Sequence, residues 1–159
     1  MADQTALSLD DLLAQEERLQ FAAFNHDTAW RLGVALVEAA RARGVSVTVD
    51  IRRGEQQVFH AAMRGTTADN DGWIERKIRV VRRLEHSSYY VGRSYTDKGT
   101  NFADQPHIDP SQFAAHGGCF PILIRGTGIV GTITVSGLPQ AVDHELLVET
   151  LEKFLAAEA

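Results

Sequence analysis

A histidine and the only cysteine of the chain lie three residues apart, in the segment His116-Gly117-Gly118-Cys119. A catalytic cysteine needs a base within reach and a lowered thiol pKa, and His116 would be that base. Cys119 also begins an apolar segment, where a free cysteine is commonly a small buried side chain. The two glycines leave the thiol–imidazole geometry open, and we favour the buried side chain over the nucleophile.

A second pair of groups, Asp143 and His144, lies near the expected start of the last helix. A carboxylate beside a histidine fixes the tautomer of the imidazole, and an aspartate there equally complements the helix dipole. Ser136 and Gly137 come shortly before them and supply a hydroxyl and a flexible backbone. Because helix N-termini attract anions, this pattern indicates a place for an anionic group.

Three further patterns have ordinary structural explanations. Residues 126–131 match the glycine spacing of the dinucleotide fingerprint, but these glycines lead into a strand where the fingerprint requires a helix. Residues 69–72 begin like a calcium loop, but Val80 stands where an EF-hand has its closing Glu, so a helix N-cap is favoured. No two of the six histidines are three or four residues apart. We therefore predict no metal site within one helix, although residues distant in sequence could converge on one.

Basic residues concentrate in the middle of the chain. Residues 52–98 hold ten of the sixteen lysines and arginines, against six acidic residues. Five of them share one predicted helix, namely Arg76, Lys77, Arg79, Arg82 and Arg83. The favoured interpretation is a solvated helix face with intrahelical ion pairs. The alternative is an anion site, in which Lys77 or Arg79 pairs with a carboxylate or phosphate of a ligand.

Length and composition restrict the class of protein. At roughly 150 residues per domain, 159 residues predict a single domain over 1–159, with residues 1–6 expected to be disordered. The net charge of −5 argues against a nucleic-acid partner, and no apolar run is long enough to predict a membrane span. One cysteine and an acidic first segment without an apolar run predict a cytoplasmic protein.

Hydrophobic periodicity predicts the elements that position these groups. Spacings of three and four residues predict helices over 8–20, 27–43, 69–86 and 139–155. Alternation predicts strands over 45–51, 57–63, 119–125 and 129–135, joined as two hairpins. The strand at 45–51 is expected to be buried on one face only. Two hairpins separated by a helix predict an α+β domain, with helices packed on the faces of an antiparallel sheet.

Two segments are less regular than the rest. The helix at 27–43 is apolar almost all round, so we expect it to be covered on more than one side, by the sheet and by another subunit. Residues 87–117 form a long irregular stretch. Such a stretch is usually functional or contains short helices, and residues 111–115 are a candidate for one helical turn.

The second hairpin predicts where the site lies. Residues equidistant from its turn face each other across the ladder, and the middle of the turn is residue 127. Position 118 should therefore lie near position 136. The start of the last helix would bring Asp143 and His144 towards His116, and we predict one concave surface lined by His116 and Ser136–Gly137. The alternative is that the glycines only permit tight packing of the helix on the strand.

Several segments resemble the heme-degrading-domain family, and more closely its small-protein branch with yeast and bacterial members. The C-terminal match consists of residues 116–122, 131–139 and 143–145. The match to the central helix of that branch consists of Asp69, Asn70, Trp73, Lys77 and His86–Ser87. The resemblance covers roughly residues 8–157.

This resemblance implies a GlcG/HbpS-like domain with a profilin-like layout, in which helices cover both faces of a five-stranded antiparallel sheet. The fifth strand would lie in residues 87–117. Members of the wider family bind heme or sense redox state, and they form dimers that assemble further, so a homo-oligomer is expected. The motifs of this branch assign no reaction, and no histidine of the chain matches a heme ligand. The cofactor therefore stays open, with heme as the candidate that the resemblance supplies.

The leading hypothesis is a domain that binds a tetrapyrrole or another anionic small molecule. Its predicted lining is His116, Gly117, Gly118, Phe120, Ser136, Gly137, Asp143 and His144, with Lys77 or Arg79 pairing with a ligand carboxylate. The alternative is a non-catalytic, oligomeric protein-interaction module, which is supported by the missing catalytic constellation and by the apolar helix at 27–43. A third hypothesis is an enzyme with Cys119 as nucleophile and His116 as base.

Overall fold

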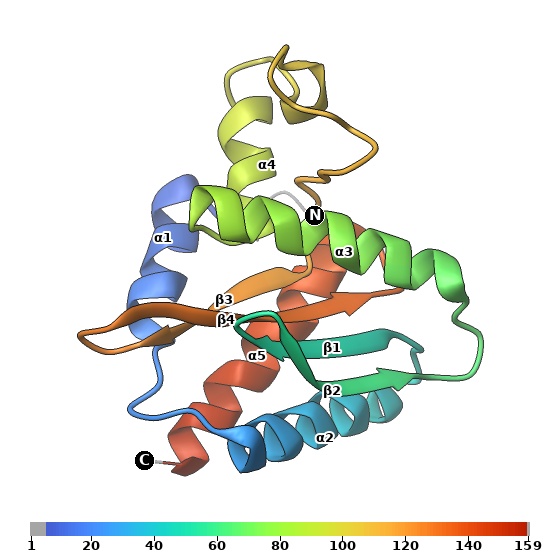
Figure 1. Cartoon of the computed structure of the whole chain (residues 1–159), viewed down its shortest axis with the longest axis vertical. Coiled ribbons are helices and arrows are strands. Elements are labelled where there is room, and N and C mark those ends of the chain that lie inside the picture. Colours follow the sequence, from blue (N-terminus) through green and yellow to red (C-terminus); the bar gives the residue numbers. More distant parts are fainter. Residues whose placement is uncertain (1–5, 159) are drawn as a thin grey trace.

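The structure, a computed structural model, describes residues 6–158. At its centre is a four-stranded antiparallel sheet in the order β2-β1-β4-β3 (Figure 1). The strands are β1 (Thr48–Arg53), β2 (Gln56–Ala62), β3 (Cys119–Ile124) and β4 (Gly128–Ser136). Both predicted hairpins are confirmed, and pairing of β1 with β4 joins them into one sheet.

Helices cover both faces of this sheet, as predicted for an α+β domain. α2 (His26–Ala42) and α5 (Gln140–Glu158) lie side by side over one face, and α3 (Ala68–Leu84) crosses the other (Figure 1). α1 (Leu9–Arg18) and α4 (Ser88–Thr96) pack against each other beyond the β3 edge. The largest hydrophobic core fills the space between the sheet and the α2–α5 pair.

The predicted start of the first helix is confirmed, and that of the third lies slightly earlier than predicted. The Ser8 hydroxyl caps α1 by accepting a hydrogen bond from the Asp11 backbone N–H at 3.0 Å. Thr67, not Asp69, caps α3. Its hydroxyl accepts from the Asp69 backbone N–H at 3.3 Å, and its own backbone N–H donates to the side chain of Asn70, at the N3 position, at 3.0 Å. The segment 69–72 is therefore the first turn of a helix.

The first strand is buried on both faces, so the prediction of one buried face is wrong. Val49 and Ile51 contribute to the large core, and their neighbours Thr48 and Asp50 are also at most 1% exposed. The cause is α3, which covers the face that carries these polar side chains. Alternation along this strand separates an apolar buried layer from a polar buried layer.

The fifth strand predicted in residues 87–117 is absent, and α4 and a short 3-10 helix, η2 (Phe102–Asp104), take its place. Residues 110–112 form a turn and residues 113–116 have no regular structure, so no helical turn spans 111–115. At the β3 edge, Phe21 makes an isolated parallel bridge with Ile124. The chain thus covers that edge without a regular strand.

The second hairpin has nearly the predicted register. Cys119 pairs with Thr134, and the Val135 N–H donates to the Gly118 carbonyl at 2.9 Å. The partner of position 118 is therefore residue 135, one residue from the prediction. Ile124 pairs with Gly128, so the turn is centred on residue 126 and not on residue 127, and a β-bulge at Ile122 and Leu123 offsets half of the resulting shift. The open ends of the two strands meet as expected.

The α2 helix is covered by the sheet and by α5, but its third side is open. Trp30 is 63% exposed and Val34 is 38% exposed, one turn apart on that side. No helix in the described part of the chain is both long enough and apolar enough to span a membrane.

Candidate functional site

Two cavities meet at Trp73 and His116, whose rings lie 5.0 Å apart. The smaller cavity, of about 280 Å³, lies between α3, the end of β4 and the start of α5. It is lined by five of the predicted site residues, namely Lys77, His116, Ser136, Gly137 and Asp143. The larger cavity, of about 540 Å³, lies between α3, α4 and the segment that leads to His116. The hairpin register and the helix start thus bring His116 and Ser136–Gly137 onto one concave surface.

A buried ion pair lies in the wall of the smaller cavity. The Lys77 ammonium donates to Asp143 Oδ2 at 3.3 Å and to the Val135 carbonyl at 3.1 Å, and both charged side chains are at most 4% exposed. The other oxygen of Asp143 accepts from the Leu138 backbone N–H at 3.0 Å. Asp143 therefore fixes both the turn before α5 and the amine of α3.

Burial opposes both charges of this pair. It raises the pKa of Asp143 to about 6, although Lys77 and backbone N–H groups act in the opposite direction. Burial likewise lowers the pKa of Lys77, against the attraction of Asp143. The charge of Lys77 is already balanced inside the protein, so the expectation that it pairs with a ligand carboxylate is not supported.

Glycine permits the close approach that this pair needs. Gly118 has a φ of +130°, and a side-chain carbon at this position would lie 2.7 Å from Lys77 Nζ. The Gly117 N–H donates to the Gln140 side chain at 3.0 Å, and an added carbon there would overlap the Gln140 carbonyl. The two glycines therefore let the segment after His116 pass between α3 and the start of α5.

His116 is half-buried at the boundary of the two cavities. Burial lowers the pKa of its imidazole, and the nearby charges of Lys77 and Arg76 lower it further. The ring is therefore neutral at pH 7, with one nitrogen able to donate and the other able to accept a hydrogen bond. In the smaller cavity, the Ser136 hydroxyl accepts from the Asn70 side chain at 3.2 Å.

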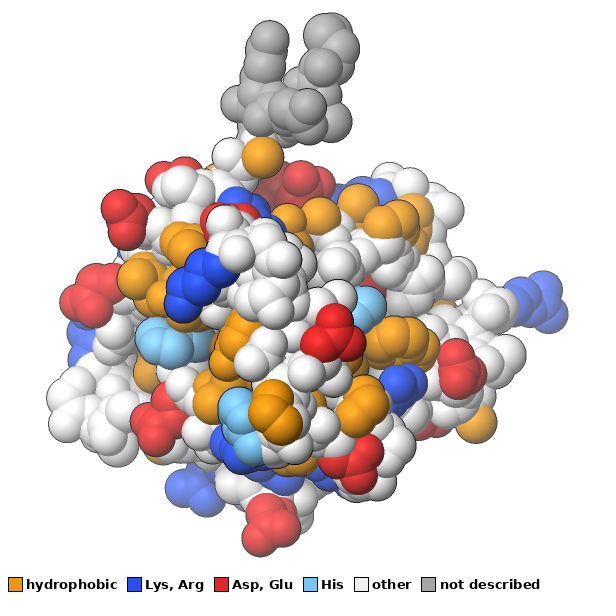
Figure 2. Space-filling model, turned by 90° about the horizontal axis from the view of Figure 1, so that it is seen from above, with side chains coloured by type: hydrophobic (Ala, Val, Ile, Leu, Met, Phe, Trp, Pro, Cys, Tyr) orange, Lys and Arg blue, Asp and Glu red, His pale blue; other side chains and the backbone are white. Residues whose placement is uncertain are grey.

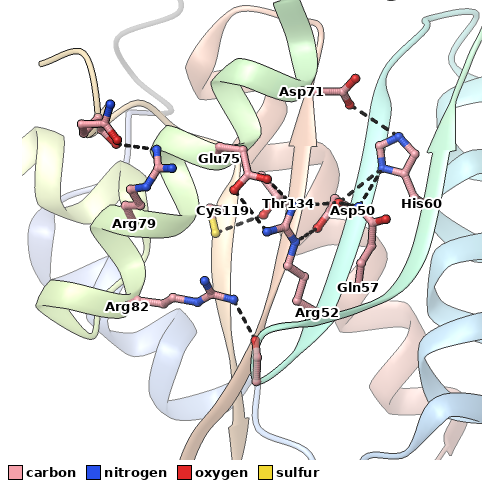
Figure 3. A network of polar contacts seen from close by, with 12 residues as sticks. Asp50, Arg52, Gln57, His60, Asp71, Glu75, Arg79, Arg82, Cys119 and Thr134 are labelled. Atoms are coloured by element: carbon pink, nitrogen blue, oxygen red, sulfur yellow. Dashed lines mark hydrogen bonds and ion pairs between the residues drawn. The ribbon is translucent and has the colours of Figure 1, made fainter. Parts of the chain in front are cut away.

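Besides Gly117 and Gly118, three predicted site residues lie outside the lining of both cavities. His144 is buried on another side of α5, where its Nε2 lies 2.8 Å from the Gln15 side-chain oxygen and its ring lies 4.9 Å from that of Tyr89. Phe120 is fully buried in the large core. Arg79 donates to the Gln112 carbonyl at 3.2 Å on the outer side of α3 (Figure 3).

Helix geometry explains why His144 is misplaced by the prediction. Successive side chains on a helix point about 100° apart, so Asp143 and His144 cannot both face one cavity. Burial lowers the pKa of His144 to about 4, which keeps this imidazole neutral. His144 is thus a buried polar residue that pairs with Gln15, and Asp143 does not orient its imidazole.

The thiol of Cys119 is fully buried beneath α3. The Thr134 hydroxyl donates to its sulfur at 3.1 Å (Figure 3), and burial raises the pKa of the thiol to about 12. A catalytic cysteine needs the opposite shift and solvent access. The favoured interpretation of Cys119 as a buried hydrophobic side chain therefore fits the structure, and the nucleophile does not.

Apart from His116, the lining of the larger cavity was not predicted. Two arginines of its wall lie over aromatic rings: Arg76 is 4.2 Å from the Trp73 ring centroid, and Arg93 is 5.9 Å from that of Tyr89. The positions 89, 93 and 96 of the wall are spaced by four and three residues, which is the spacing of one helix face. That spacing was the available signal, but the glycines and prolines of residues 87–117 obscured the helix.

Figure 2 views the molecule from the end that carries α4 and the segment after it. Hydrophobic side chains, histidines and charged groups of both signs are interspersed on this face, and no continuous basic area covers it. Within residues 6–158, no three metal-binding side chains of His, Cys, Asp or Glu cluster. Guanidinium groups, aromatic rings and one neutral imidazole are thus the principal chemical groups around the larger cavity.

Comparison with known proteins gives a consistent result. Residues 24–152 match the model of the family described as haem degrading protein HbpS-like. The chain is 55% identical to a UPF0303 protein of Streptomyces avermitilis over 148 residues, which are 93% of this chain and 91% of that protein. It is 52% identical to a UPF0303 protein of Streptomyces coelicolor over 151 residues, which are 95% and 96% of the two chains.

Solved structures share the fold over most of the chain. The yeast protein Ybr137w superposes with a TM-score of 0.88 at 28% identity, covering 99% of this chain and 92% of that one. A structure described as a PduOC:heme complex superposes with a TM-score of 0.68 at 17% identity, covering 83% and 94%. The resemblance inferred from the sequence motifs is confirmed, and the chain belongs to the family of HbpS-like haem-degrading proteins.

Proposed function

We propose that this protein binds a planar, anionic small molecule, and specifically a tetrapyrrole, in the larger cavity. The observation that carries the proposal is that two guanidinium groups, of Arg76 and Arg93, line a cavity whose walls also contain the rings of Trp73 and Tyr89. Arginine binds carboxylates through paired hydrogen bonds, and aromatic rings stack on a planar ligand. A volume of about 540 Å³ lies within the range of about 300–1,000 Å³ that is usual for small-molecule sites.

His116 completes this arrangement. A neutral imidazole is the commonest protein ligand for transition metals, and burial and neighbouring cations keep this ring neutral. The residues present therefore fit a metallated tetrapyrrole, with Arg76 and Arg93 towards its carboxylates and His116 towards its metal. Arg93 also pairs with Asp97 at 3.1 Å, but this pair is partly exposed, and the guanidinium has further N–H donors for a ligand. A tetrapyrrole would supply redox chemistry when bound. The heme named for the PduOC structure is an independent reason to choose this ligand class.

Titration with hemin tests the proposal directly. We expect a saturable Soret shift in the wild-type protein. Replacing Arg76 or Arg93 by Gln should weaken binding about tenfold or more, because each change removes a charge-assisted hydrogen bond of about 1.5–3 kcal/mol. Arg79→Gln is the matched control, since Arg79 lies on the same helix as Arg76 but outside both cavities.

Absence of a saturable Soret shift, or equal weakening of hemin binding by Arg79→Gln, would refute tetrapyrrole binding in the larger cavity. Binding of an anionic dye such as anilinonaphthalene sulfonate, sensitive to Arg76 and Arg93, would retain only the broader anion proposal.

A second candidate function is protein interaction through a homo-oligomer. The observation that favours it is the exposed pair of Trp30 and Val34 on the open side of α2. Large exposed hydrophobic side chains on one helix face are typical of contact surfaces, and a second copy of the chain is the occupant that we propose. Light scattering would test it: Trp30→Glu should reduce the assembly size, whereas Lys153→Glu, on an exposed position of α5, should not. A wild-type monomer at micromolar concentration would exclude this function.

A further inference from the structure

The amine of Lys77 is only partly satisfied by the protein. An ammonium has three N–H donors, and two of them have acceptors, the Val135 carbonyl and Asp143 Oδ2. No third acceptor exists among residues 6–158, and Lys77 lines the smaller cavity. Buried polar groups are normally fully paired, so an open position beside a cavity indicates a place for an oxygen atom of a ligand.

The surroundings of this amine favour its neutral, nucleophilic form. Burial lowers the pKa of Lys77 and raises that of Asp143 to about 6, and the two groups are 3.3 Å apart. A proton that leaves the ammonium can therefore pass directly to the adjacent carboxylate. Gly118 leaves room beside the nitrogen that any side chain would fill. A desolvated lysine next to an acid–base group is the usual arrangement of lysines that attack carbonyl carbons.

We propose that Lys77 is a carbonyl-reactive lysine, which forms a Schiff base with a small aldehyde or ketone bound in the smaller cavity. The cavity volume of about 280 Å³ admits a small carbonyl compound, since a cavity of about 150 Å³ already holds benzene. The charges of Lys77 and Asp143 offset each other, His116 is neutral, and Asp69 adds a negative charge to the lining. An uncharged carbonyl compound therefore fits better than a keto acid.

Each step balances with groups that lie in the cavity. The ammonium of Lys77 gives one proton to Asp143, and its nitrogen then attacks the carbonyl carbon. The carbonyl oxygen gains a proton as the C–N bond forms and the amine loses one, which gives a carbinolamine. Asp143 returns its proton to the hydroxyl, the C–O bond breaks, and water leaves. The product is a protonated Schiff base that is paired with the Asp143 carboxylate, so the net charge of the pair is preserved throughout.

Competitive labelling tests this proposal, because the chain has only three lysines and the other two, Lys98 and Lys153, are exposed. The folded protein is treated at pH 7 with limiting acetaldehyde and cyanoborohydride, which reduces each Schiff base to a stable ethylamine, and adducts are mapped by mass spectrometry. Each unit by which burial lowers an amine pKa raises its neutral fraction about tenfold. Because the pKa of Lys77 is lowered, we expect it to react several times faster than either exposed lysine. In urea, all three lysines should react equally.

Variants separate the mechanism from simple reactivity. Asp143→Asn removes the charge that raises the pKa of Lys77, which alone would speed labelling, so slower labelling of Lys77 in this variant, with Lys98 and Lys153 unchanged, is the result expected if Asp143 relays the proton. Lys77→Arg should abolish the adduct in its peptide. Slower labelling of Lys77 than of both exposed lysines in the folded wild-type protein would overturn the proposal and leave a purely structural ion pair. This readout needs no tetrapyrrole, so the reactive lysine and the larger cavity can fail independently.

Discussion

Removing the buried ion pair one residue at a time is expected to cost much more than removing it entirely. The variants are Lys77→Met, Asp143→Asn and the double substitution. Burial raises the pKa of Asp143 from 3.8 to about 6 even with Lys77 beside it, so water contributes little to either charge and each depends on its partner. Each single variant leaves one buried charge without its partner, and we expect a loss of about 3 kcal/mol in the free energy of unfolding.

The double variant leaves no charge to compensate. Methionine fills much of the space of the lysine stem, and an asparagine oxygen can still accept from the Leu138 N–H. Replacing both members of a buried pair is often neutral or stabilising. We therefore expect the double variant to be nearly as stable as the wild type, with a coupling energy of about 3 kcal/mol or more between the two sites.

Urea unfolding at pH 7 measures the three losses by linear extrapolation. The control cycle uses Arg41 and Glu38, an exposed i,i+3 pair at 3.0 Å on α2, whose coupling should be below about 1 kcal/mol. If the effects of the two buried substitutions were additive, Lys77 and Asp143 would not interact energetically, and their ion pair would not stabilise the site.

The stabilising effect of Asp143 is also expected to depend on pH. The folded pKa of Asp143 is raised, so its contribution to stability is fully present below its unfolded pKa and is lost as pH rises from about 4 to about 6. The wild type should therefore lose stability relative to Asp143→Asn as the pH rises across that window. A difference that is flat from pH 4 to 6 would show that burial does not shift this pKa.

Three further predictions concern buried groups around the site. Burial lowers the pKa of His144 to about 4. Its contribution to the free energy of unfolding is therefore fully present above pH 6.5, and about 3 kcal/mol is lost as the pH falls towards 4. His144→Leu should abolish this loss in acid unfolding curves. Cys119, with its pKa raised to about 12, should resist iodoacetamide at pH 8 when folded and react rapidly in urea; fast labelling of the folded protein would contradict its burial. Gly92→Ala would overlap the Ala115 carbonyl and should cost about 1–3 kcal/mol in urea unfolding, whereas Gly72→Ala, with open space around it, should not destabilise.

Features set by local rules could be predicted from the sequence. Each hairpin is defined by alternating residues on both sides of a glycine-containing turn, and the open end of the second one follows from counting outward from residue 127. This count correctly predicted that His116 and Ser136 lie close together, although they are twenty residues apart in the sequence. The turn is centred on residue 126, one residue earlier than predicted, and the bulge at Ile122 and Leu123 offsets half of that shift, so the partner of position 118 differs by one position only.

Features set by packing between distant elements could not be predicted. The larger cavity is bounded by α4, which a pattern interrupted by glycines hid, and by loop residues that no periodicity describes. The position of His144 depended on the rotation of α5 about its own axis, and proximity in sequence to Asp143 was a misleading guide. The buried state of Lys77 depends on the Val135 carbonyl and Asp143, which lie 58 and 66 residues away in the chain.

The polar layer beneath α3 shows why the open donor of Lys77 is distinctive. Asp50 is as deeply buried as Asp143, but its carboxylate accepts from Arg52 at 2.9 Å and from Gln57 at 2.5 Å, and it lies 3.3 Å from His60 Nδ1 (Figure 3). Burial of a charge is tolerated when hydrogen bonds replace its hydration, and Asp50 has that full set. It therefore needs nothing from outside the protein. Lys77 is also buried, but only two of its three N–H donors have acceptors among the described residues. The unpaired donor beside a cavity, and not the burial of the charge, is the reason to propose a reaction at Lys77 and not only a structural ion pair.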